Sequence, residues 1–198
     1  MFKSTNGGQG DWRPVMDFAD AIPVGAIAID PTNPDVMYAG TGEPTMELTK
    51  SYGAPSYSGV GVMKSTDAGE SWTRLPWPQS SSAIHEIIID PRNTQIIFAA
   101  SRSHLWRTED GGQVWTRVQT GVATDVVFRP DNPDVVFVGI GNDNGAVANG
   151  VYRSVENGQQ YKWAKVATNF PASDSVGRIK LAVTPANPNL LLAFVMRA

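Results

Sequence analysis

The chain has 198 residues and a net charge of −3, and its Lys and Arg residues are scattered, which excludes the basic surface typical of nucleic-acid or anionic-membrane binding. It has no cysteine, which excludes disulfides, thiol catalysis and thiolate metal sites. With 19 Gly, 14 Pro and 18% charged residues, the composition favours many short strands joined by tight turns over amphipathic helices.

One type of turn recurs four times along the chain. It occupies residues 4–12, 65–72, 108–115 and, in a looser form, 154–163, and each copy is flanked by short β-prone runs. Its glycines permit the positive φ of a tight turn, its Ser, Thr and Asp oxygens can accept hydrogen bonds from turn amides, and its Trp covers the hairpin. The two regular copies predict these structural residues: Ser65, Asp67, Gly69, Trp72, Thr108, Asp110, Gly112 and Trp115.

A second type of turn alternates with the first. It contains Pro and Asn at residues 30–35, 90–94, 129–134 and 184–189, and each copy separates two β-prone runs, such as residues 26–29 and 36–39. Pro fixes φ, and Asn or Asp bonds its local backbone, so each copy predicts a strand, a turn and a strand.

The two turns together predict a repeated meander. With strand A before the Asn-Pro turn, B after it, and C and D around the other turn, the chain reads C-D, three times A-B-C-D, and then A-B. Four antiparallel strands of this kind form a propeller blade, and radial packing protects their edges. We therefore predict an all-β fold, a β-propeller of four-stranded antiparallel blades, with about four blades' worth of strands.

The predicted organisation is a C-D half blade at residues 1–23, blades at 24–83, 84–123 and 124–175, and an A-B half blade at 176–198. We favour the interpretation that the chain is part of a larger propeller. The alternative is a closed ring in which the first and last hairpins pair with each other.

The first type of turn resembles the BNR or Asp-box repeat, S-x-D-x-G-x-x-W. The chain as a whole resembles bacterial "glycosyl hydrolase, BNR repeat" proteins and, more distantly, xyloglucan-cleaving hydrolases and sortilin-type propellers. This resemblance implies a propeller that acts on glycans or serves as a binding scaffold, because the box is a folding device shared by enzymes and binders. It does not fit a sialidase, whose Arg-Ile-Pro motif would fall where this chain has Ala21-Ile22-Pro23.

The loops divide between two faces. The A-B and C-D turns share one face, so Asp67 and Asp110 belong to turns, whereas the B-C and D-A loops form the opposite face, where propellers usually bind. The first B-C loop, residues 41–59, is much longer than a hairpin requires and carries Glu43, and the third B-C loop carries Asp143. Because glycoside hydrolysis needs two facing carboxylates, Glu43 and Asp143 are the candidate catalytic residues. The alternatives are a solvated insertion for the first loop and an Asx turn for Asp143.

Other side chains of the same loops are candidate ligand contacts, either because their rings could stack on a sugar or because they carry polar groups. They are Glu47, Tyr52, Tyr57, Trp77, His85 and Asn142. For His85 the alternative is an ordinary loop residue. The sequence predicts no cofactor and no metal site.

We expect a propeller module that binds or acts on carbohydrate through its B-C and D-A loops. Whether it is an enzyme stays open; if so, the resemblance implies a glycoside hydrolase of the BNR-repeat type. The alternative is a non-catalytic protein-binding scaffold, sortilin-like or assembly-factor-like. The expected partner is a polysaccharide or protein ligand, with no nucleic acid and no membrane insertion, and the rest of a larger propeller chain could be needed for binding. The resemblance suggests an extracellular or periplasmic location, although the first residues show no signal-peptide pattern.

Overall fold

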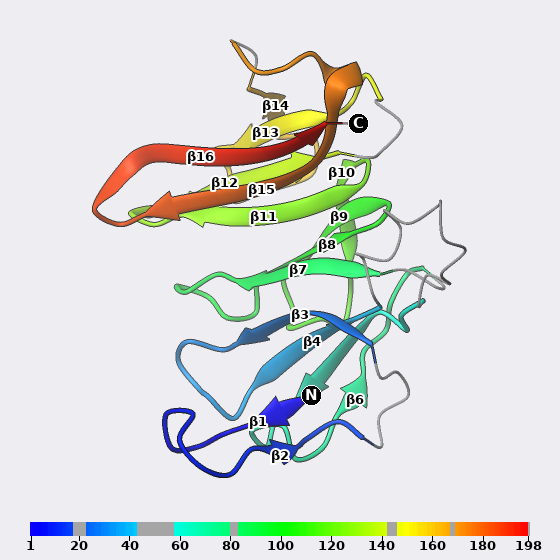
Figure 1. Cartoon of the computed structure of the whole chain (residues 1–198). Coiled ribbons are helices and arrows are strands. Elements are labelled where there is room, and N and C mark those ends of the chain that lie inside the picture. The colour runs from blue at the N-terminus through cyan, green and yellow to red at the C-terminus, as the bar shows by residue number, and fades with distance from the viewer. Residues whose placement is uncertain (18–22, 43–57, 80–82, 142–145, 167–168, 198) are drawn as a thin grey trace.

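The computed structural model describes residues 1–17, 23–42, 58–79, 83–141, 146–166 and 169–197. Strands in this part of the chain form five antiparallel sheets stacked one on another (Figure 1). No helix of the described residues is long and apolar enough to cross a membrane. The predicted all-β class with four-stranded antiparallel blades is confirmed.

The three central sheets are complete blades, each a meander of four consecutive strands. The first is built from β3 (Val24–Ile29), β4 (Met37–Thr41), β5 (Val62–Ser65) and β6 (Thr73–Arg74). The second is built from β7 (Ile84–Ile89), β8 (Ile97–Ser101), β9 (His104–Thr108) and β10 (Thr116–Thr120). The third is built from β11 (Ala123–Arg129), β12 (Asn132–Ile140), β13 (Gly150–Ser154) and β14 (Trp163–Lys165).

Two-stranded sheets lie at the two ends of the stack. One is β1 (Phe2–Lys3) with β2 (Arg13–Pro14), and the other is β15 (Val176–Thr184) with β16 (Asn187–Arg197), which follows a 3-10 turn at Ser173–Ser175. Figure 1 shows them at opposite ends, and they pair only within themselves. The closed-ring alternative is therefore wrong for this structure, in which the blades form an open arc, a partial propeller.

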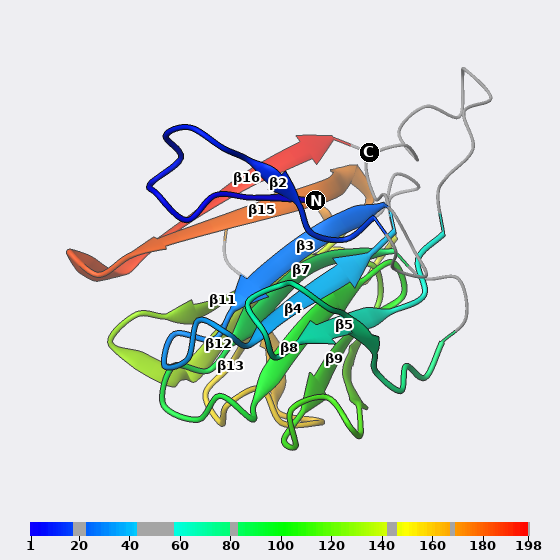
Figure 2. The same cartoon turned by 90° about the horizontal axis from the view of Figure 1, so that it is seen from below.

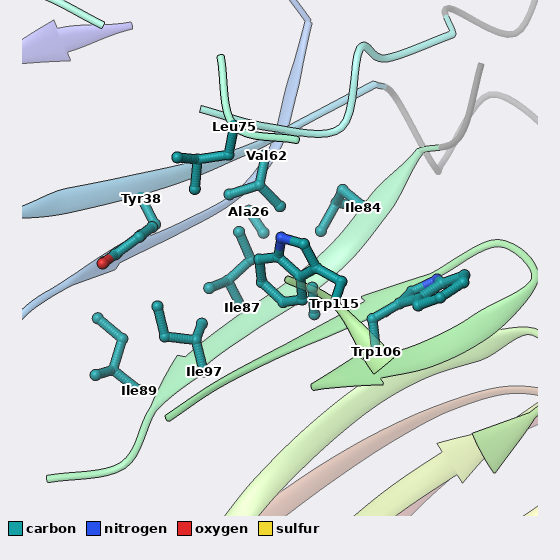
Figure 3. Packing of buried hydrophobic residues seen from close by; sticks show 11 residues of the cluster. Ala26, Tyr38, Val62, Leu75, Ile84, Ile87, Ile89, Ile97, Trp106 and Trp115 are labelled. Atoms are coloured by element: carbon teal, nitrogen blue, oxygen red, sulfur yellow. The ribbon is translucent and has the colours of Figure 1, made fainter. Parts of the chain in front are cut away.

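Burial explains why the sheets stack. The strands carry apolar side chains on both faces, and each pair of neighbouring sheets encloses its own core. The core between the first two blades gathers isoleucines of β7 and β8 with Trp106 and Trp115 against Tyr38 and Val62 (Figure 3). Figure 2 shows β3, β4 and β5 of the first blade lying over β7, β8 and β9 of the second.

Two glycines allow the blades to approach closely. A Cβ added to Gly40 of β4 would lie 2.5 Å from the Ile84 side chain of the next blade. A Cβ added to Gly139 of β12 would lie 2.8 Å from Ile179 of β15. Since real Cβ atoms are never so close to a neighbour, strand B needs glycine at these two positions to admit the inner strand of the next blade.

In each complete blade the first strand is the inner one, and it begins with the same irregularity. The register shifts between Val24 and Ala26 in β3, between Ile84 and Glu86 in β7, and between Ala123 and Asp125 in β11. Such a β-bulge redirects the side chain of the extra residue. The bulged residues are Gly25, His85 and Thr124, and the last two make contacts described below.

Candidate functional site

Backbone hydrogen bonds fix which loops share a face. In each blade an amide of the C-D turn donates to a carbonyl of the A-B turn: Ala68 N to Asp35 O at 2.9 Å, Gly111 N to Gln95 O at 3.0 Å, and Asn157 N to Asp134 O at 2.8 Å. The A-B and C-D turns therefore lie together at one end of every blade. We call this arrangement the turn clasp. The B-C and D-A loops begin at the other end of the strands.

The acidic residues of the regular C-D turns are occupied by the turns themselves. Asp67 accepts hydrogen bonds from the Ser65 hydroxyl at 2.7 Å and from the amide and hydroxyl of Ser71 at 2.9 and 2.5 Å. Bonds from Ser71, followed by the bond from Ser65, lower the pKa of Asp67 to about 2. A carboxylate held in this way stabilises its own hairpin.

The second regular turn repeats this geometry. Asp110 accepts the Thr108 hydroxyl at 2.6 Å and the amides of Gln113 and Val114 at 2.9 Å each, and these bonds lower its pKa. In both turns the tryptophan indole donates to a turn carbonyl, Trp72 to Gly69 at 3.1 Å and Trp115 to Gly112 at 3.0 Å. The positive φ values of Gly69 and Gly112 are those expected for the turn.

Six of the predicted site residues lie outside the described residues. They are the candidate catalytic pair, Glu43 and Asp143, and four candidate ligand contacts, Glu47, Tyr52, Tyr57 and Asn142. The strands that lead to the two acids are described: β4 ends at Thr41 and β12 ends at Ile140. The catalytic and binding roles of these residues stay predictions.

Trp77 follows β6 and lies at the junction of the first two blades. Its ring makes edge-to-face contacts with Trp106 and Trp115, with centroids 5.7 and 5.1 Å away. A Cβ on Gly61, whose φ is +98°, would lie 2.3 Å from the same ring, so this glycine makes room for the indole. The half-buried Trp77 thus packs between blades, and its role as a ligand contact stays a prediction.

His85 is placed differently from the prediction. It is the bulged residue of β7 rather than a loop residue, and it is only 7% exposed. Its Nδ1 lies 2.8 Å from the carbonyl oxygen of Ala123 in the next blade, so Nδ1 carries the proton and donates. Burial lowers the pKa of His85 to about 4, with the positive charge of Arg178 contributing, so the side chain is neutral at pH 7.

Thr124, the bulged residue of β11, makes the equivalent contact one blade further along. Its hydroxyl donates to Ile179 O at 2.8 Å and accepts from Ile179 N at 3.1 Å. The bulge of one inner strand therefore bonds the backbone of the next inner strand, twice in succession. This repetition indicates that His85 joins blades.

The sequence reasoning missed a charged cluster on the inner strands. Lys180 of β15 lies 3.0 Å from Glu86 of β7 and 3.5 Å from Asp125 of β11, so one cation links three successive blades. The buried Asp125 also accepts the amide of Leu181 at 2.7 Å. The available signal was that Glu86 and Lys180 lie among the apolar residues of the inner strands β7 and β15. Among the described residues no group of three or more His, Asp or Glu is arranged to hold a metal ion.

Stacked four-stranded meanders, with their inner strands side by side and a repeated turn clasp, define a β-propeller protein. The chain belongs to the Sortilin-Vps10 family, described as sortilin, neurotensin receptor 3, whose model matches residues 61–194.

Curated relatives include xyloglucanases. The chain is 31% identical over 121 residues to a xyloglucanase of Paenibacillus sp, covering 54% of this chain and 11% of that protein. It is 27% identical over 191 residues to xyloglucanase Xgh74A of Acetivibrio thermocellus, covering 76% of this chain and 21% of that protein. The chain thus spans about a tenth to a fifth of these relatives.

Solved structures show the same fold. The chain superposes on an ancestral GH74 enzyme with a TM-score of 0.66 at 21% identity, and the match covers 99% of this chain and 27% of that one. The arc of blades is therefore a part of a propeller architecture known from larger proteins.

Proposed function

We propose that the chain is a propeller segment that binds or acts on a polysaccharide of the xyloglucan type through its B-C and D-A loop face, within a secreted or envelope protein. The observation that carries this proposal is the 27–31% identity to proteins named xyloglucanases. The resemblance extends beyond the turns, since one match covers 76% of this chain.

The loop lengths support the choice of face. The B-C connections of the complete blades differ in length. The second blade has only residues 102–103 there, whereas the first has residues 42–61, which is longer than any A-B turn of the complete blades. Long loops on a rigid frame are where binding residues concentrate. If catalysis occurs, Glu43 and Asp143 are the proposed acid and base or nucleophile, one extending from the end of β4 and the other from the end of β12.

A non-catalytic protein-binding scaffold is the second candidate. It is favoured by the family model, whose description is that of a sortilin receptor. Such a role needs no pair of carboxylates and would use the same loop face.

The test measures the retention of the chain in native gels containing xyloglucan, with mannan as the control polysaccharide, and the release of reducing ends. We expect retention by xyloglucan alone, weakened in Glu43→Gln and Asp143→Asn. Asp35→Asn, an exposed change in an A-B turn at the other end of the blade, should leave retention unchanged. Loss of reducing-end release in both acid variants would establish catalysis. Absence of retention by any polysaccharide would overturn the proposal and favour the scaffold.

A further inference from the structure

A groove follows the junction between the second and third blades, on the side of the C-D turns. Its central hollow of about 490 Å³ lies between Arg107 and Glu109 of one blade and Gln159 and Gln160 of the next. A hollow of about 400 Å³ continues it past Arg107 toward the A-B turns, and one of about 130 Å³ continues it along β10 to Tyr161 and Trp163. Shared lining residues join the three hollows, and we call them together the junction groove.

The third blade supplies one wall through an irregular turn. Ser154 and Trp163 are nine positions apart, whereas Ser65 and Trp72 are seven apart. The longer segment carries Gln159, Gln160 and Tyr161 out along the groove. Tyr161 has a φ of +63° and is 89% exposed, an arrangement that costs backbone energy and presents a flat ring to solvent.

Arg107 forms the floor of the groove and is held rigidly. It is only 7% exposed, its guanidinium lies over the ring of Phe98, and its two terminal nitrogens donate to Glu109 at 2.5 Å and to Asn157 at 2.9 Å. Asn157 is in turn fixed by a bond to the buried Asp90 at 2.8 Å. The Nε–H of Arg107 is buried and has no acceptor among the described residues.

Trp163 provides a second donor of this kind. The indoles of Trp12, Trp72 and Trp115 each donate to a glycine carbonyl of their own turn. In the longer turn the indole Nε1 of Trp163 is buried and has no acceptor among the described residues. Both nitrogens belong to side chains that line the groove, and buried donors are rarely left unpaired in native proteins.

The chemistry of the lining favours a neutral polyhydroxyl compound. The exposed Glu109 carboxylate can accept from hydroxyls, the two glutamine amides donate and accept, and the arginine and indole donors need oxygen acceptors. The charges of Arg92, Arg107 and Arg117 largely offset those of the acids along the groove, which disfavours a strongly charged ligand. The exposed tyrosine ring can cover the apolar face of a sugar.

We infer that the junction groove is a second saccharide site, which binds a short neutral oligosaccharide across Arg107, Gln160 and Tyr161, on the end of the blades opposite the loop face. The ligand class rests on the proposed function, but the place does not. The competing occupant is an extended peptide that pairs with the free edge of β10. The experiment below distinguishes the peptide from the sugar.

The experiment follows the Arg107 Nε–H and Trp163 indole resonances of the chain by NMR during titration with xyloglucan heptasaccharide. Saturable shifts of both resonances are expected, with binding weakened about fivefold in Tyr161→Gly and in Gln160→Ala. Glycine suits the positive φ at position 161, so that variant removes the ring without strain. Gln113→Ala, an exposed change in the preceding turn, is the matched control and should bind like the unmodified chain.

Glu43→Gln and Asp143→Asn separate the two saccharide sites. Shifts at Arg107 and Trp163 that persist in these variants support a separate groove site. Unshifted groove resonances at roughly 10 mM sugar, with binding still lost in the acid variants, would overturn this inference and leave the proposed function standing. Shifts produced by an extended peptide and not by the sugar would overturn it in favour of strand addition to β10.

Discussion

At the scale of single residues, the buried His85 is expected to make stability depend on pH. Its pKa is about 4 in the folded protein and close to 6.5 when unfolded. Between these values the unfolded chain binds a proton that the folded protein does not, so stability falls as the pH falls. The difference between the two pKa values corresponds to about 3 kcal/mol in the free energy of unfolding.

We therefore expect the free energy of unfolding to decrease by about 3 kcal/mol between pH 7 and pH 4, and His85→Asn to remove most of this dependence. Asparagine keeps a donor for the Ala123 carbonyl. The measurement is urea unfolding at several pH values. His104→Asn is the control, because His104 is less buried although burial also lowers its pKa. An unchanged pH slope in His85→Asn would contradict the assignment.

Asp67 acts in a different pH window. Its folded pKa of about 2 lies below the ordinary value near 3.9, so its contribution is complete above pH 4 and is lost as the pH falls toward 2. Asp67→Asn should flatten the acid limb of stability between pH 4 and pH 2, and above pH 5 it should lower the stability without changing its pH slope. Acid titration followed by tryptophan fluorescence measures this, with Asp35→Asn as the control. Equal acid limbs in the two variants would refute the role of Asp67.

Three of the turn tryptophans differ in burial, and their variants should differ in stability. Trp115 is buried in the core between the first two blades, Trp72 is half-buried, and Trp12 is exposed. Trp115→Ala is expected to cost about 3–5 kcal/mol, Trp72→Ala less, and Trp12→Ala under about 1 kcal/mol. Urea unfolding of the three variants tests this order. A loss below about 1 kcal/mol for Trp115→Ala would show that the indole does not hold the hairpin.

Residue identities indicated part of the site chemistry. The turn pattern located the Asp67 and Asp110 hairpins because hydroxyl, carboxylate and glycine at that spacing act locally. Lys180 and Glu86 were missed because their meeting depends on the stacking of blades 94 positions apart in sequence. Arg107 was missed for the same reason, since its partner Asn157 belongs to the next blade.

At the scale of elements, the alternation of two turn types was enough to predict the meander. The continuous apolar run at residues 87–89 is shorter than the strand that contains it, because β7 begins at Ile84. His85 and Glu86 interrupt the apolar run there, and a β-bulge accommodates both. Bulges arise from the packing of one inner strand on the next, which no single run of residues reveals.

The link between β7, β11 and β15 gives a prediction at this scale. Asp125 is buried and bonds both Lys180 and the Leu181 amide, whereas Glu86 is partly exposed. Asp125→Ala should cost about 1–3 kcal/mol, because it leaves a buried amide unpaired. Glu86→Ala should cost under about 1 kcal/mol, as expected for a solvent-accessible ion pair. Urea unfolding of the two variants measures these costs. Equal losses of stability would mean that the bond from the Leu181 amide to Asp125 contributes nothing.

At the scale of the whole molecule, the arc exposes the outer face of its last sheet. Leu192 and Phe194 of β16 are 60% and 69% exposed, next to Leu190. In the other blades the equivalent face is covered by a neighbouring blade. An apolar strip of this kind on an edge sheet promotes association.

We expect this chain to self-associate at high concentration, and Leu192→Lys with Phe194→Lys to shift it toward the monomer. Light scattering after size-exclusion chromatography measures the mass. Gln113→Lys adds a charge at an exposed polar position elsewhere and should not change the mass. Association that is unaffected by the double variant would place the contact on another surface.

The turn clasp has a consequence for protein engineering. Its bonds join main-chain atoms of the two turns, so the fastening at this end of the blade does not involve the segments at the other end. The two-residue link between β8 and β9 could therefore be replaced by randomised loops, in the way antibody frameworks carry theirs. A stack of such blades would serve as a display scaffold in which several neighbouring loops are varied while the fastened ends keep the strands in register.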